Sequence, residues 1–111
     1  MRRMAVAVLT HAFPLAVAAR GLYRRIRRPI TVGVRAMIVQ DNQILLVRQH
    51  GNAQWVMPGG AAARGETLRT AAAREAHEET GCTVEPERLL GLYTAVHEGM
   101  TNHVAVFVCR A

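Results

Sequence analysis

The stretch GAAARGETLRTAAAREAHEETGC, residues 60–82, decides the fold because it predicts one strong helix that follows a glycine-bearing loop. Thr67 is a suitable N-cap, Ala and Leu fill the helix body, and Gly81 stands where many helices end in a left-handed residue. We therefore expect a helix from Thr67 to Thr80.

This helix carries carboxylates on the side that should face the rest of the protein. At about 100° per residue, that side comprises Leu68, Ala71, Ala72, Glu75, Ala76, Glu78 and Glu79. Glu75 and Glu79 repel one another at i, i+4, and the helix dipole disfavours anions in the C-terminal half. A divalent cation bound through oxygen ligands would relieve both effects. The alternative is a solvated acidic face that pairs with Arg74.

The spacing of the charged residues resembles a known motif. Gly60, Glu66 and the run REAHEETGC at 74–82 resemble the Nudix box, G-x5-E-x7-R-E-U-x-E-E-x-G-U, in which U is apolar. The fixed positions all agree: Gly60, Glu66, Arg74, Glu75, Glu78, Glu79 and Gly81. Small residues fill the two U positions. The resemblance covers the chain from about residue 31 to its end.

The resemblance implies an activity and a metal site. Nudix-like enzymes hydrolyse a nucleoside diphosphate linked to another group, X, at its pyrophosphate, and they use Mg²⁺ or Mn²⁺. By this resemblance Glu78 and Glu79 are the expected metal ligands, and the Gly60 carbonyl is a further one. Glu75 is expected to be a ligand or the base that deprotonates the attacking water. The catalytic residues are therefore expected to be Glu75, Glu78 and Glu79.

Residues around this acidic side have supporting or less specific roles. Arg74 projects away from the metal-binding side, and we expect it to pair with Glu66 and to fix the loop against the helix. An ordinary surface ion pair is the alternative. Glu98, in a predicted turn, is a candidate base, extra ligand or substrate contact, and a solvated turn residue is its alternative. His50 and Trp55 could line a nucleobase pocket by stacking, or Trp55 could belong to the core.

Charge separates the 111-residue chain into two parts. Residues 1–28 hold seven Arg and no acid, whereas residues 29–111 hold seven Arg against eight acids. The net charge of +6 therefore belongs to a basic N-terminal segment, 1–29, and the near-neutral Nudix-like domain spans 30–111. This distribution disfavours a nucleic-acid partner for the domain. The resemblance implies a nucleotide-type small-molecule substrate instead.

The N-terminal segment reads from Leu15 as a basic amphipathic helix, with Leu15, Leu22 and Ile26 on one face. It could pack on the domain or be partly disordered, lie on an anionic membrane surface, contact RNA phosphates, or belong to an export signal. Its apolar runs are too short to span a membrane.

Two cysteines, Cys82 and Cys109, have no metal-ligand spacing. We therefore expect free thiols in a reduced, cytoplasmic protein. The sequence leaves the substrate and the oligomeric state open, a homodimer included.

Alternation and turn residues predict the remaining elements. The expected strands are Ile30–Gln40, Ile44–Val47, Gln54–Met57, Leu89–His97 and Val104–Val108. The expected connections include a turn at Asp41-Asn42, a loop at Glu85-Pro86-Glu87 and a turn over Glu98–Asn102. Together they predict an α+β domain with a mixed sheet, in agreement with the α/β/α sandwich that the resemblance implies.

One feature departs from the family pattern. Family members usually continue with a further strand and a C-terminal helix, whereas this sequence stops at Ala111. A fragment, a truncated product and a domain completed by another subunit all fit this observation. The alternative to a hydrolase is therefore a non-catalytic Nudix-fold module that binds a nucleotide, RNA or an anionic membrane surface.

Overall fold

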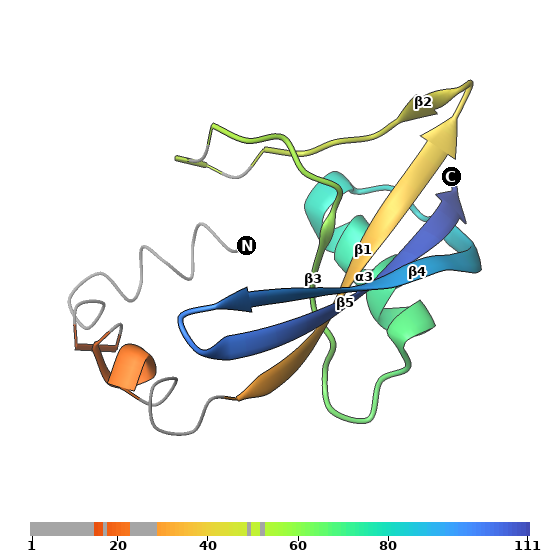
Figure 1. Ribbon diagram of the computed structural model, residues 1–111. Helices are drawn as coiled ribbons and strands as arrows, with labels where there is room; N and C mark the ends of the chain where they lie inside the picture. Colours follow the sequence, from red (N-terminus) through yellow and green to blue (C-terminus); the bar gives the residue numbers. More distant parts are fainter. Residues whose placement is uncertain (1–14, 17, 23–28, 49, 52) are drawn as a thin grey trace.

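The computed structural model describes residues 15, 16, 18–22, 29–48, 50, 51 and 53–111. From the start of the sheet the elements follow one another in a simple order (Figure 1). They are β1 (Ile30–Gln40), β2 (Gln43–Ile44), β3 (Gly59–Ala61), α3 (Leu68–Thr80), β4 (Glu85–His97) and β5 (Met100–Arg110).

The strands form one mixed sheet in the order β2-β1-β5-β4, with β3 paired to β1 beside β2. β1 runs parallel to β5 from the Ile30–Thr101 pair to the Val39–Arg110 pair, and the other pairings are antiparallel. The predicted α+β class with a mixed sheet is therefore confirmed. The strand Ile30–Gln40 was predicted with the bounds that it has.

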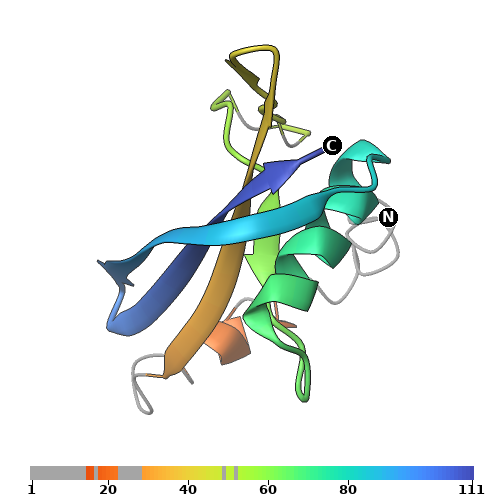
Figure 2. The same ribbon diagram turned by 90° about the vertical axis from the view of Figure 1, so that its right-hand side faces the viewer.

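The core lies between α3 and one face of the sheet (Figure 2). Alternate residues of β1 point toward the helix, and the parallel register places alternate residues of β5 beside them. The buried residues of the sheet on this face are Val34, Ala36, Ile38, Ala105, Phe107 and Cys109. The helix contributes Ala71, Ala72 and Ala76, which are fully buried. Small side chains at these positions let the helix approach the sheet closely.

The ends of α3 are those that the sequence predicts. Thr67 has an extended backbone, and its hydroxyl accepts a hydrogen bond of 3.1 Å from the Thr70 N–H. Gly81 adopts φ +78°, and its N–H donates to the His77 carbonyl at 2.9 Å. A left-handed backbone strains any residue with a Cβ, so glycine is suited to this position.

The segment between β1 and β3 is less regular than predicted. The turn at Asp41-Asn42 is present, with φ values of 52° and 60°. The predicted strand Ile44–Val47 is wrong beyond β2, and the predicted strand Gln54–Met57 reduces to one bridge. In that bridge Val47 and Val56 exchange two hydrogen bonds, of 2.7 and 2.8 Å. Among the described residues of this segment, which we call the β2–β3 arm, Val47 and Val56 form an isolated bridge and not a continuous ladder.

The predicted loop at Glu85-Pro86-Glu87 is wrong, because these residues begin β4. Pro86 is buried and pairs with Cys109, and the register shifts between Pro86 and Arg88. A proline without an N–H is tolerated at a bulge of an edge strand. The predicted turn over Glu98–Asn102 is shorter than expected, since Glu98 and Gly99 alone connect β4 to β5.

The described part of the N-terminal segment is helical at residues 15, 16 and 18–22. Leu15 and Leu22 are 76% and 59% exposed, so these two side chains are not packed on the domain. The rest of the predicted amphipathic helix, Ile26 included, lies outside the described residues. Within the described ranges, no helix is both long and apolar enough to cross a membrane.

Both cysteines are free, as expected. Cys109 is buried, and burial raises the pKa of its thiol to about 11, which keeps the thiol protonated. Cys82 is half-buried at the end of the glycine turn that follows α3.

Candidate functional site

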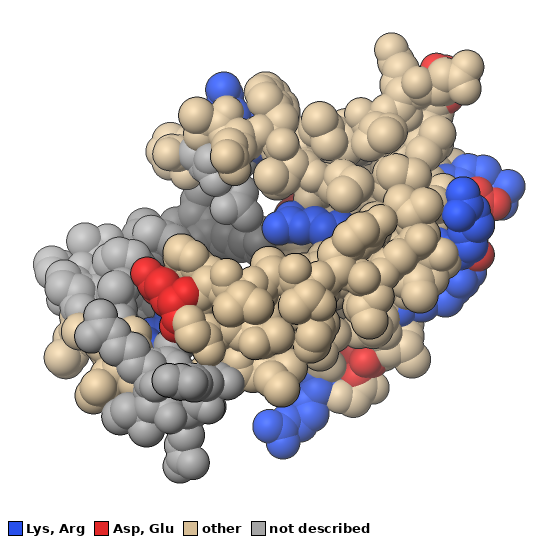
Figure 3. All heavy atoms as spheres, viewed as in Figure 1, with Lys and Arg blue, Asp and Glu red and all other residues tan. Residues whose placement is uncertain are grey.

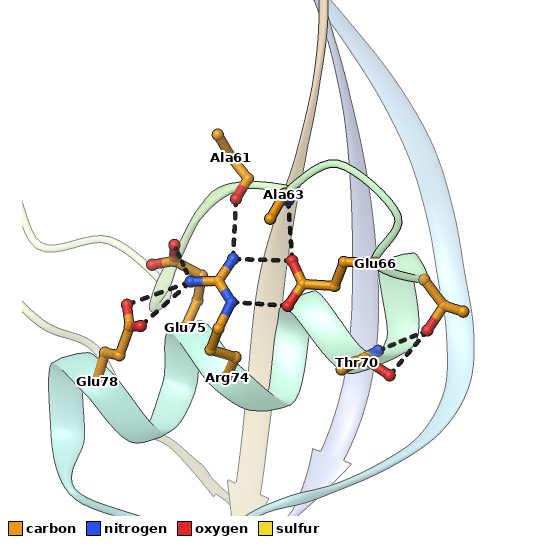
Figure 4. A network of polar contacts seen from close by, with 8 residues as sticks. Ala61, Ala63, Glu66, Thr70, Arg74, Glu75 and Glu78 are labelled. Carbon is orange, nitrogen blue, oxygen red and sulfur yellow. Dashed lines mark hydrogen bonds and ion pairs between the residues drawn. The ribbon is translucent and has the colours of Figure 1, made fainter.

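The loop between β3 and α3 is tied to the helix by one residue pair (Figure 4). Arg74 Nε donates to Glu66 Oε2 at 2.7 Å, and Arg74 Nη2 donates to Glu66 Oε1 at 3.0 Å. The Ala63 N–H donates to the same carboxylate at 2.9 Å, and Arg74 Nη2 also donates to the Ala61 carbonyl at 3.1 Å. The expected pairing of Glu66 with Arg74 is therefore present.

The other side of the same guanidinium faces the helix carboxylates. Arg74 Nη1 lies 3.1 Å from Glu75 Oε1 and 3.3 Å from both oxygens of Glu78. The expectation that Arg74 points away from the carboxylate side is thus wrong. An arginine side chain is long enough to reach around the helix surface, so its Cα direction does not fix where its charge lies.

Charge pairing changes the proton affinity of both partners. The hydrogen bonds from Arg74, helped by the Ala63 N–H, lower the pKa of Glu66 from 4.5 to about 2. The hydrogen bonds from Glu66, and then those from Glu75 and Glu78, raise the pKa of Arg74 above its usual value. Both groups therefore keep their charges at any pH near neutrality.

The helical projection predicts that the carboxylate-bearing side of α3 is turned toward the interior of the protein, and this is confirmed for only part of that side. Glu75 is 4% exposed and lies among the buried alanines of α3, whereas the Glu78 side chain is 41% exposed. Glu79 is half-buried and faces β3, where its Oε2 accepts a hydrogen bond of 2.9 Å from the Gly59 N–H. The three carboxylates therefore have two different partners. Glu75 and Glu78 face Arg74, and Glu79 faces Gly59 at the start of β3.

Gly59 allows this contact because the chain passes very close to β1. A Cβ at Gly59 would overlap the Val34 carbonyl oxygen and lie 2.7 Å from Arg35 Cδ. Only glycine fits a backbone approach of this kind.

Gly60, the predicted carbonyl ligand, belongs to the same short strand but faces β1. It pairs with Val34, and a Cβ built on Gly33 would lie 3.2 Å from the Gly60 oxygen. Its role as a ligand stays a prediction.

The carboxylates do not converge on one point in this arrangement. Within the part of the chain that the structure describes, no three His, Cys, Asp or Glu side chains lie close enough together to hold a metal ion. Two of the predicted ligands, Glu75 and Glu78, nevertheless approach the same positive nitrogen, Arg74 Nη1. This pair of carboxylates therefore already serves as the binding site of a cationic group.

Glu66, Arg74, Glu75 and Glu78, with the Ala61 carbonyl, form what we call the Arg74 network. The residues that we predicted to contact the substrate lie outside it. Trp55 is 59% exposed, and the Arg48 guanidinium carbon lies 5.0 Å from the centre of its ring. Trp55 therefore does not belong to the core. His50 is exposed on the same arm, and Glu98 lies in the β4–β5 turn, 3.7 Å from His97 Nε2. Their roles in substrate binding stay predictions.

A cavity of about 300 Å³ lies on the sheet face away from α3. Its lining includes Thr31, Gly33, Arg35, Gly60, Asn102 and Val104. Thr31 donates to Asn102 Oδ1 at 3.0 Å, and Arg35 Nη1 donates to the Met57 carbonyl at 2.8 Å. Sequence reasoning missed this cavity. An arginine that alternates with apolar residues inside a strand was the available signal.

The cavity and the Arg74 network meet at β3. Gly60 and Ala61 line the cavity, and the Ala61 carbonyl accepts from Arg74 on the other side. A group bound in the cavity would therefore lie beside the loop that carries Glu66.

Comparison with known proteins decides the family. A model of the NUDIX domain matches residues 27–110. The chain belongs to the Nudix family. A MutT-like protein of Streptomyces ambofaciens is 37% identical over 81 residues, which are 72% of this chain and 51% of that protein. An ADP-ribose pyrophosphatase of Methanocaldococcus jannaschii is 36% identical over 89 residues, 78% of this chain and 52% of that protein.

Solved Nudix structures resemble this fold. A UDP-X diphosphatase matches with a TM-score of 0.67 and 33% identity over 72% of this chain and 41% of its own. A NUDIX hydrolase from Nitrosomonas europaea matches with a TM-score of 0.66 and 33% identity over 72% of this chain and 57% of its own. The chain spans about half the length of the MutT-like protein and of the ADP-ribose pyrophosphatase named above.

Proposed function

We propose that this Nudix chain is a metal-dependent hydrolase that cleaves the pyrophosphate bond of a nucleoside diphosphate linked to another group. The observation that carries the proposal is the acidic cluster of α3 around Arg74. Glu75 and Glu78 share one guanidinium nitrogen, and Glu79 lies one turn beyond Glu75. The names of the relatives, an ADP-ribose pyrophosphatase and a UDP-X diphosphatase among them, support this class of substrate.

The donor set fits a hard divalent cation, Mg²⁺ in our proposal and Mn²⁺ as its substitute. All the donors are oxygens, and two carboxylates already bind a positive group. We infer that Glu78 and Glu79 hold the cation, with the Gly60 carbonyl as a further ligand and Glu75 as a third carboxylate or the base. When bound, the cation would neutralise pyrophosphate charge and make a bound water more acidic.

The chain's own residues would position this chemistry. Arg74 holds Glu75, which is 4% exposed, at 3.1 Å and thereby fixes where its carboxylate points. Glu66 in turn fixes Arg74 through two hydrogen bonds. Because outer partners of this kind orient the groups that bind a metal, we infer that Glu66 and Arg74 act on turnover through Glu75 and Glu78.

The cavity beside β3 suits part of an anionic nucleotide. Arg35 is the charged residue of its lining, and its guanidinium has donors beyond the one that the Met57 carbonyl accepts. Asn102 accepts from Thr31 through its oxygen, which directs its amide donors elsewhere. We infer that this cavity takes part of the substrate nucleotide, with Arg35 toward an anionic group. Trp55, His50 and Glu98 are not among its lining residues, and we infer that they contact the substrate outside it.

We also infer that this activity belongs to a reducing compartment, the cytoplasm. Cys82 and Cys109 are both free, and the buried thiol of Cys109 is inert. Reduced cysteines are the usual state in that compartment.

The proposal is tested by incubating the chain with a panel of NDP-X compounds and nucleoside triphosphates, with Mg²⁺, with Mn²⁺ and with EDTA. Release of a nucleoside monophosphate that EDTA abolishes would support it. A folded sample, verified by circular dichroism, that releases nothing from any compound would contradict it.

A further inference from the structure

The free edge of β4 is apolar in the half of the strand that lies next to the β4–β5 turn. β4 ends the sheet, since the strand order is β2-β1-β5-β4. No charged residue occurs between Leu89 and Val96, and several large apolar side chains there are exposed. They are Leu89 (53%), Leu90 (42%), Leu92 (61%), Tyr93 (55%) and Val96 (71%). Exposed edges of natural sheets usually carry charges, prolines or bulges that prevent pairing.

Those protective features are confined to the first half of β4. Pro86 and the register shifts lie between Pro86 and Gly91, whereas residues 91–97 pair with β5 without interruption. Figure 3 shows an uncharged surface over the middle of β4 and β5, with acidic atoms at the end where the turn lies. The regularly paired part of β4 is therefore also the part that lacks charge.

The pairing of β4 with β5 determines which N–H and C=O groups of β4 are available to another strand. The two-residue turn makes His97 and Met100 a hydrogen-bonded pair, and antiparallel pairs alternate between bonded and non-bonded types. Leu92, Thr94 and Val96 therefore direct their N–H and C=O groups away from β5, toward the free edge. These groups form a continuous template for another antiparallel strand.

We propose that β4 pairs with β4 of a second copy of this chain, antiparallel and about a two-fold axis at Thr94. This register sets Leu92 opposite Val96 of the second copy, so that two apolar side chains meet, and it sets Thr94 opposite itself. It also brings the Arg88 end of one strand toward the Glu98 end of the other. Arg88 forms no ion pair with any described residue, whereas Glu85 and Glu87 already pair with Arg69 and Arg110.

This surface is self-complementary, which is why a second copy fits it. A two-fold axis places the same strand on both sides, so the apolar side chains of one copy face those of the other. At each end of the pairing, Arg88 of one copy approaches Glu98 of the other. The two sheets become one continuous sheet across the axis. The pairing is independent of the proposed hydrolase activity, because β4 residues 92–96 contribute nothing to the Arg74 network.

The test is the solution mass of the full chain by light scattering or sedimentation. We expect a dimer of the 12.2 kDa chain, and a shift to one chain in the double variant Leu92→Lys/Val96→Lys. Both side chains are mostly exposed, so the variant should retain its fold. Ile44→Lys, on the opposite edge strand and 49% exposed, is the matched control and should remain dimeric. A monomeric wild type, or a dimer that survives the double variant, would overturn the proposal.

A cross-link tests the register without any charge change. In a bonded antiparallel pair the Cα atoms lie about 5.5 Å apart, within the range that a disulfide spans. Thr94→Cys should therefore form a covalent dimer on mild oxidation, whereas the wild type, with Cys82 and Cys109, and Ile44→Cys should not. Arg88→Glu should weaken the dimer and Arg88→Glu/Glu98→Arg should restore it. No cross-link at residue 94 would exclude this register.

Discussion

Arg74 and Glu66 are joined by two hydrogen bonds, Nε to Oε2 at 2.7 Å and Nη2 to Oε1 at 3.0 Å. The pair links the loop after β3 to the middle of α3, and the same guanidinium holds Glu75 and Glu78. A bidentate contact of this kind fixes the orientation of the guanidinium as well as its distance from the carboxylate. The positions of Glu75 and Glu78 therefore depend on a loop residue, Glu66, that acts through Arg74.

Glu66→Gln should lower turnover without abolishing it. The amide keeps the size of the side chain but removes the charge that holds Arg74, so Glu75 and Glu78 lose their fixed partner. We expect kcat to fall about 10- to 100-fold, as for other residues that orient metal-binding groups. Glu87→Gln, which removes a surface carboxylate paired with Arg110, is the control and should retain full activity. Equal activity of the two variants would exclude this positioning role.

The same pair predicts a pH dependence of stability. Arg74 lowers the pKa of Glu66 from 4.5 to about 2, so as the pH falls the unfolded chain binds this proton before the folded chain does. The stabilisation is therefore complete above pH 4.5 and is lost as the pH falls toward 2. Thermal unfolding of the wild type and Glu66→Gln should differ most above this window and converge below it. A constant difference across the window would contradict the assigned pKa.

Gly59→Ala should disrupt the approach of β3 to β1. The added methyl group would overlap the Val34 carbonyl oxygen, so the strand must shift and Glu79 would lose its contact with the Gly59 N–H. We expect a loss of about 1–3 kcal/mol in the free energy of unfolding, measured with denaturant. Gly21→Ala, where no atom lies within 4 Å of the added Cβ, should be neutral or slightly stabilising.

Ala72→Leu tests the close packing of α3 on the sheet. Ala72 is fully buried against the core, so the larger side chain has no space and should cost about 1–3 kcal/mol of stability. His77→Leu on the exposed side of the same helix should change stability by less than about 0.5 kcal/mol. Because leucine has a higher helix propensity than histidine, similar losses in both variants would contradict close packing at Ala72 as the cause.

The elements that the sequence predicts well are those with local signals. The cap at Thr67, the left-handed Gly81 and the alternation of Ile30–Gln40 all act within a few residues, and the structure contains each of them. The pairing of Glu66 with Arg74 was also predictable, although that prediction came from resemblance to a family motif.

The features that sequence reasoning missed depend on long-range pairing. Pro86 enters a strand because Cys109 of β5 lies beside it, and no local signal indicates that partner. The cavity exists because the parallel register of β1 and β5 places Asn102 beside Thr31. The direction of Arg74 was misjudged because a helical projection follows Cα positions, whereas a long side chain can place its charge elsewhere.

The most direct test of the central claim is Mg²⁺-dependent turnover of Glu78→Gln beside Glu87→Gln. Both variants replace a partly exposed carboxylate by an amide of the same size, at 41% and 47% side-chain exposure. If the box glutamates carry the chemistry, Glu78→Gln should remain folded and lose its metal-dependent release of nucleoside monophosphate, whereas Glu87→Gln should match the wild type. Unimpaired turnover in Glu78→Gln would contradict the assignment of this carboxylate to the catalytic metal.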